Sequence, residues 1–156
     1  MATKTANVSP ALQRIRELLD QDRPDEALNL AARSGDESPE MKNAHAVCLL
    51  RLGRFDEAIK VLQDLACQGM AAGMSHHAPP LFQVNFAIAM LRANREKGGA
   101  MLIADWLTGN EHPEAAKLKA AVRQWKKSLG LLGRLRCRLG AYPAKPVPLD
   151  ERAGAA

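Results

Sequence analysis

The chain has 156 residues, a formal net charge of +5 and 47% apolar residues. No run of about 18 uncharged apolar residues occurs, which excludes a transmembrane helix. The first ten residues, MATKTANVSP, lack the apolar core of a signal peptide, and the three cysteines are widely spaced without a CxxC pair. We therefore expect a cytoplasmic protein with reduced thiols.

The first predicted element is a pair of helices over residues 9–35. Residues 1–8 are polar, and we expect them to be disordered. Ser9 followed by Pro10 predicts a helix start, because Ser accepts the free amides of the first turn and Pro at the first helical position loses no hydrogen bond. Pro24 begins the second helix of this pair.

Residues 39–68 hold the clearest pattern in the chain. Ala46 and Leu50 share one apolar helix face, and Ala58 and Leu62 repeat that spacing in a second helix. Gly53 lies between the two helices, where a left-handed residue can end the first one. The pattern predicts an αα-hairpin.

A third hairpin is predicted over residues 79–108, after a loop at residues 69–79 that contains two glycines. Its first helix holds the sequence LFQVNFAIAML, which is apolar around most of its circumference and is typical of the middle of a helical stack. Its second helix is expected between residues 96 and 107.

The last predicted helix covers residues 113–139 and caps the stack. A seam of apolar residues at spacings of three and four predicts the face that packs: Leu118, Val122, Trp125, Leu129 and Leu132. Residues 141–156 contain several prolines, and we expect an extended, poorly ordered tail.

The central hairpin resembles a tetratricopeptide repeat. The matching residues are Ala46, Gly53, Phe55, Asp56, Glu57, Ala58, Leu62 and Leu65. Weaker copies lie on both sides, because positions 23–30 align with positions 54–61 and positions 87–103 align with positions 46–62. The resemblance implies an all-α domain over residues 9–140, built as a right-handed superhelical stack of about three αα-hairpins with a C-terminal capping helix.

In such a stack the first helix of each hairpin lines a concave face that can bind a partner peptide or helix. The residues expected on that face are Arg16, Asn43, Val47, Leu50, Arg51, Val84, Ile88, Leu91 and Arg92. Leu50, Ile88 and Leu91 can equally be read as ordinary core between helices. The function predicted is a noncatalytic adaptor or chaperone-like scaffold that binds another protein, with self-association as an alternative.

Positive charge is concentrated near the end of the chain, where residues 115–149 hold nine Lys or Arg and no acidic residue. One side of the predicted capping helix carries a basic surface: Lys119, Arg123, Lys127, Arg134 and Arg138. This surface can be a solvated outer face, or it can bind nucleic acid or an anionic membrane, which is the alternative function.

Catalytic motifs are lacking, and the sequence predicts neither an enzyme nor a cofactor. Cys67, Met70 and Met74 lie near His76 and His77, but their spacing matches no established metal site, so we expect a polar loop there. His45 falls within a predicted helix and is interpreted as a packing or surface residue.

Overall fold

The computed structural model describes residues 9–66, 78–93, 112–139, 147–149 and 154–156. Within these ranges all regular secondary structure is α-helical, which confirms the predicted all-α class. The helices are α1 (Pro10–Asp20), α2 (Pro24–Arg33), α3 (Pro39–Arg51), α4 (Phe55–Ala66), α5 (Pro80–Arg92), α7 (Pro113–Ser128) and α8 (Leu131–Arg138). None of these helices is long and apolar enough to cross a membrane.

Helices α1 and α3 begin where the sequence predicts them. The Leu12 amide donates to Ser9 Oγ and the Met41 amide to Ser38 Oγ, each at 3.3 Å, so a serine caps both α1 and α3. Each cap is followed by a proline at the first helical position. Because proline has no amide hydrogen, it adds no unsatisfied donor to the first turn.

The turn between α3 and α4 depends on Gly53, which has a φ of +74°. The Arg54 amide donates to the Leu49 carbonyl at 2.9 Å, and the Gly53 amide donates to the Leu50 carbonyl at 3.2 Å. These two bonds satisfy carbonyl groups that the end of a helix leaves open. Gly53 therefore ends α3 and sets the direction of α4.

The turn between α1 and α2 has the same pattern of hydrogen bonds. The Arg23 amide donates to the Leu18 carbonyl at 2.9 Å, and the Asp22 amide donates to the Leu19 carbonyl at 3.1 Å. Asp22, with a φ of +59°, takes the conformation that Gly53 takes in the second hairpin. The two hairpins are thus copies of one unit, although only one has glycine at this point.

An ion pair in the first turn of the second helix also repeats. Arg54 Nε and Nη2 donate to the two Glu57 oxygens at 2.7 and 2.6 Å. In the first hairpin Arg23 makes the same paired contacts with Glu26, both at 2.6 Å. All four side chains are exposed, so these pairs contribute little to stability, but they mark the repeat register.

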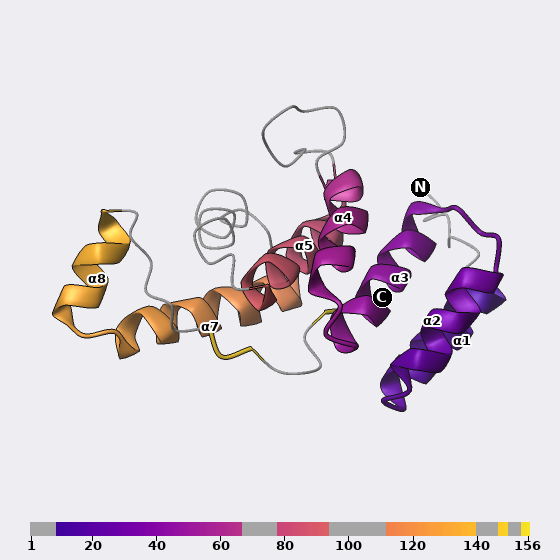
Figure 1. Cartoon of the computed structure of the whole chain (residues 1–156), viewed down its shortest axis with the longest axis horizontal. Helices are drawn as coiled ribbons and strands as arrows, with labels where there is room; N and C mark the ends of the chain where they lie inside the picture. The colour runs from indigo at the N-terminus through magenta and orange to yellow at the C-terminus, as the bar shows by residue number, and fades with distance from the viewer. Residues whose placement is uncertain (1–8, 67–77, 94–111, 140–146, 150–153) are drawn as a thin grey trace, which may run out of the picture.

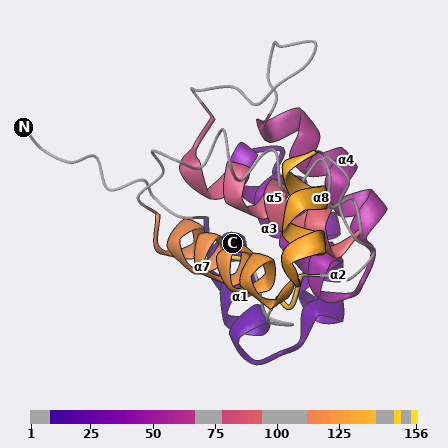
Figure 2. The same ribbon diagram turned by 90° about the vertical axis from the view of Figure 1, so that its left-hand side faces the viewer.

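Packing follows the order of the chain, as a helical stack requires. Each helix from α1 to α4 contacts the next one, and α5 contacts α7. The first helices of the hairpins also contact each other, α1 with α3 and α3 with α5. Figure 1 shows the result as a row of helices with α7 and α8 at the far end from α1 and α2, and Figure 2 views the row from the α8 end.

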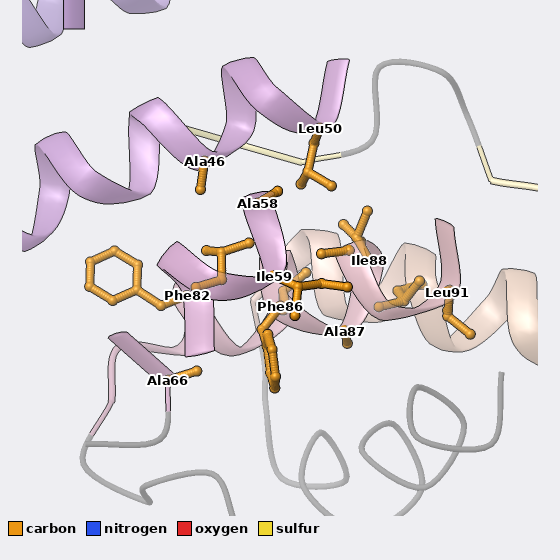
Figure 3. Packing of buried hydrophobic residues seen from close by; sticks show 14 of the residues in the cluster. Ala46, Leu50, Ala58, Ile59, Ala66, Phe82, Phe86, Ala87, Ile88 and Leu91 are labelled. Carbon is orange, nitrogen blue, oxygen red and sulfur yellow. The ribbon is translucent and has the colours of Figure 1, made fainter. Parts of the chain in front are cut away.

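Two apolar cores hold the stack together. The N-terminal core joins the first hairpin to α3 and consists of Leu12, Ile15, Leu18, Leu19, Ala27, Ala31, Met41, Ala44, Val47 and Cys48. The central core joins α3, α4, α5 and α7. Figure 3 labels members of this core on three helices, among them Ala46 and Leu50 on α3, Ala58 and Ile59 on α4, and Phe86 on α5. Most of α5 is buried, as its composition predicts.

The C-terminal helix differs from the prediction, because the structure has two helices where we expected one over 113–139. Leu129 is extended, with φ −77° and ψ 132°, and Gly130 then precedes α8. Leu118, Val122 and Trp125 are buried as predicted, whereas Leu132 is 75% exposed. The prediction for Leu132 was wrong because the break changes the helical phase after Leu129.

Several predictions concern residues outside the described ranges. These are residues 1–8, the loop with His76 and His77, and the helix expected between residues 96 and 107. Of the predicted tail, residues 147–149 and 154–156 are described. Within these two short stretches, Val147 is buried in the central core, and Ala156 packs against the N-terminal core.

The Gly53 turn leads to a stability prediction. Gly53→Ala is expected to lower the free energy of unfolding by about 1 kcal/mol, because an L side chain disfavours a left-handed backbone. An added Cβ would meet no atom within 4 Å, so a steric clash contributes nothing to this loss. Urea denaturation followed by circular dichroism measures the change.

Gly53→Asn is the matched control, since asparagine tolerates positive φ better than alanine does. We expect it to lose less stability than the alanine variant. Equal losses in the two variants, or no loss in Gly53→Ala, would contradict the role of the left-handed turn.

Candidate functional site

The residues predicted to bind a partner all lie on the first helices of the hairpins, α1, α3 and α5. Six of them are buried: Asn43, Val47, Leu50, Val84, Ile88 and Leu91. The three arginines, Arg16, Arg51 and Arg92, are half-buried. Leu50, Ile88 and Leu91 belong to the central core.

Two asparagines form a buried polar pair between α3 and α5. Asn43 is 1% exposed and Asn85 is fully buried. Asn85 Nδ2 donates to Asn43 Oδ1 at 2.8 Å. A buried amide side chain must have hydrogen-bond partners, and one bond between the two leaves further donors and acceptors to satisfy. The pair therefore needs a third polar group.

Ala155 supplies that group through its main chain. Its carbonyl accepts from Asn85 Nδ2 at 2.7 Å and from Asn43 Nδ2 at 3.1 Å. Its amide donates to Asn85 Oδ1 at 3.2 Å. Asn85 thus contacts both the donor and the acceptor of one residue, as a neighbouring strand would. We call Asn43, Asn85 and the adjacent Val47 and Leu50 the amide site.

The apolar residues of the amide site, Val47 and Leu50, lie next to Gly154. A Cβ placed on Gly154 would lie 3.7 Å from both Val47 Cγ1 and Leu50 Cδ1, and 3.5 Å from Asn85 Oδ1. Gly154 has a φ of +108°, a conformation that residues with side chains rarely adopt. The segment 154–156 therefore has a glycine at the position where its backbone meets the amide site.

Sequence reasoning found only part of this site. It placed Asn43 on the partner-binding face but missed Asn85, because the alignment of the repeats paired Asn43 with Val84. The signal for Asn85 was present: it is a short polar side chain in the middle of the apolar run LFQVNFAIAML. Nothing in the proline-containing tail indicated that residues 154–156 would reach these helices.

Two of the predicted arginines, Arg51 and Arg92, contact other parts of the fold. Arg51 Nη1 donates to the Leu19 carbonyl at 2.6 Å, which satisfies a carbonyl near the end of α1. The Arg92 guanidinium lies 5.9 Å from the centre of the Phe55 ring. Arg16 Nε and Arg51 Nε are buried and have no acceptor in the described part of the chain.

A hollow of about 480 Å³ lies among α2, α3 and α4 and is lined by residues that include His45, Lys42, Asp36 and Asp64. Burial, and then the charge of Arg54, lower the pKa of His45. The described residues contain no group of three or more side chains able to hold a metal ion. Burial raises the pKa of Cys48 to about 12, so this thiol stays protonated at neutral pH.

The basic surface divides between α7 and α8. Arg123 and Lys127 are exposed and Lys119 is half-buried, whereas the side chain of Arg138 lies outside the described part. Arg134 binds the end of α7, because its Nε and Nη2 donate to the carbonyls of Leu129 and Lys127 at 3.1 and 2.8 Å.

Helix α8 exposes its apolar side chains. Leu131 is 85% exposed and Leu139 is 77% exposed, and Leu132 and Leu135 also face solvent. Leu131, Leu135 and Leu139 recur at every fourth position, so they share one helix face.

Comparison with known proteins identifies part of this stack. Residues 18–68 match the family model described as tetratricopeptide repeat. No curated protein and no solved structure matched the chain significantly. The matched residues run from the end of α1 through α4 and include both copies of the repeated turn and ion pair. This stretch of the chain is therefore similar to tetratricopeptide repeats.

Proposed function

We propose that this protein is a noncatalytic protein–protein interaction module, an adaptor or a chaperone-like scaffold. It binds a partner peptide or helix in a groove on the face shared by α1, α3 and α5. The stack supports this proposal, because tetratricopeptide repeats are interaction modules and the contacts of α1 with α3 and of α3 with α5 make one continuous surface.

One observation carries the proposal: the amide site already holds a piece of polypeptide. Asn85 binds the amide and the carbonyl of Ala155, and Asn43 binds the same carbonyl. Groups that satisfy a main-chain donor and acceptor together are suited to peptides in general, since every residue except proline offers both. The amide site is therefore the proposed centre of partner binding.

The proposed binding face extends from the amide site toward α1 and along α5. It includes Arg16, Arg51, Arg92, Val84, Ile88 and Leu91. Arg16 Nε and Arg51 Nε are buried donors without acceptors in the described part of the chain, and a partner's carbonyl or carboxylate would satisfy them. Ile88 and Leu91 are buried beneath this face, as members of the central core.

The noncatalytic assignment rests on the side chains that could act as a nucleophile or a base. The Cys48 thiol is buried, with a pKa of about 12, which makes it a poor nucleophile. His45 lies at the hollow among α2, α3 and α4, whose described lining residues include no Cys, Ser or Thr that it could activate.

Substituting both asparagines tests the proposed binding site. Asn43→Leu with Asn85→Leu is expected to reduce capture of partner proteins from a cell extract at least 10-fold, equivalent to about 1.4 kcal/mol. Leucine has a similar volume but neither donates nor accepts, so the contacts to a peptide main chain are lost. Quantitative affinity purification with mass spectrometry measures the captured partners.

Asn29→Leu is the matched control, because Asn29 is an exposed residue on α2 that receives the same substitution. It should leave capture unchanged, and thermal unfolding should show that all variants are folded. If the double variant retains the partners of the wild type, the amide site is not where partners bind.

A second candidate function is binding to an anionic membrane through α7 and α8. The exposed leucines of α8 favour it, because Leu131, Leu135 and Leu139 form an apolar face on the helix that follows α7, where Arg123 and Lys127 are exposed. A basic helix with one apolar face can lie at a membrane surface, with its charges near anionic headgroups. Nucleic acid is less favoured, because exposed leucines add nothing to phosphate binding.

Vesicle sedimentation tests this candidate. The chain should bind vesicles containing phosphatidylserine at low salt, and Leu131→Ser with Leu135→Ser should reduce binding by about 100-fold or more, since two buried leucines each contribute roughly 1.5–3 kcal/mol. Arg123→Glu with Lys127→Glu should weaken it further. Absence of binding at low salt would remove this candidate, and binding to DNA alone would point to nucleic acid instead.

A further inference from the structure

We propose that residues 154–156 act as a tethered ligand of the amide site, which competes with any partner that binds there. The partner that displaces them presents a short segment of the same kind, with a glycine before the residue whose main chain the asparagines bind. This inference rests on the proposed function, because it concerns how that binding face is regulated and what it selects.

The first argument is that the contacts to Ala155 are all made by its main chain. Asn85 Nδ2 and Asn43 Nδ2 donate to its carbonyl, at 2.7 and 3.1 Å, and its amide donates to Asn85 Oδ1 at 3.2 Å. Every residue except proline offers the same main-chain amide and carbonyl. Another segment of equal shape can therefore replace this one and make the same hydrogen bonds to the two asparagines. The contacts that hold the tail are thus those that a partner needs.

Shape selects which segments fit. The φ of +108° at Gly154 favours glycine, because residues with a side chain rarely adopt it. Ala156 continues into contact with the N-terminal core. A segment with glycine at this position meets the backbone requirement.

The tail is also attached close to the site. Val147 is buried in the central core and Leu149 packs against the same core, and only residues 150–153 separate Leu149 from Gly154. A short connection between an anchored point and a binding segment gives a high effective concentration. Weak contacts are then enough to keep the amide site occupied.

Occupation by the tail lowers the affinity for partners in a calculable way. The apparent dissociation constant equals the intrinsic one divided by the fraction of molecules with an open site. If the tail fills the site in about 90% of molecules, partner binding weakens by about 10-fold. Removing residues 154–156 should therefore strengthen partner capture by about that factor.

Nuclear magnetic resonance on the ¹⁵N-labelled protein tests this inference directly. Removal of residues 154–156 from the chain should shift the side-chain amide signals of Asn43 and Asn85, while the signal of the exposed Asn29 stays in place. A synthetic peptide with the sequence of residues 150–156 should then return the shifted signals toward their original positions. The same peptide concentration should leave the full chain nearly unchanged.

A control peptide with valine in place of Gly154 should fail to restore the signals, because its backbone cannot adopt the required φ without strain. The inference is overturned if removal of residues 154–156 leaves the Asn43 and Asn85 signals unshifted. It is also overturned if the peptide shifts the full and shortened chains equally.

The two proposals can fail separately. In one outcome the amide signals show that residues 154–156 occupy the site, but the Asn43→Leu with Asn85→Leu variant keeps all captured partners. The proposed function is then wrong, while the binding of residues 154–156 to the amide site stands. If that variant loses its partners while removal of residues 154–156 changes neither the signals nor the capture, the amide site binds partners without competition from the tail.

Discussion

The buried asparagine pair imposes the constraint on which the candidate site depends. Asn43 and Asn85 lie between α3 and α5, away from water, and their polar atoms need partners. The pair satisfies itself only in part, and the main chain of Ala155 completes it. Two apolar residues at these positions would pack α3 against α5 without needing any hydrogen-bond partner. The two amide side chains instead have donors and acceptors left over, and a peptide main chain can satisfy them.

This position exists because the hairpins stack. A single hairpin cannot bury its own apolar face, so α3 packs against α5 and brings Asn43 and Asn85 within hydrogen-bonding distance. The left-handed turn recurs before this point, with Asp22 in the first hairpin and Gly53 in the second. Helix packing thus brings together two residues that lie far apart in the sequence.

Periodicity predicted the helices of the first two hairpins and α5, because serine–proline starts, Gly53 and apolar spacing act locally. It failed after Leu129, where one extended residue changes the helical phase and exposes Leu132. It also failed for the amide site. The contact between Ala155 and Asn85 is distant in sequence and involves only main-chain atoms of the tail, so no side-chain pattern records it. Asn43 was predicted to lie on the binding face, but the sequence analysis did not identify its hydrogen-bond partner Asn85.

Hydrogen exchange at the Ala155 amide tests the central claim most directly, namely that the amide site binds peptide main chain. The bond from this amide to Asn85 Oδ1 should slow its exchange by about 10-fold or more relative to an unstructured chain, since exchange requires the segment to leave the site. Exchange at the rate of an unstructured peptide would contradict the account.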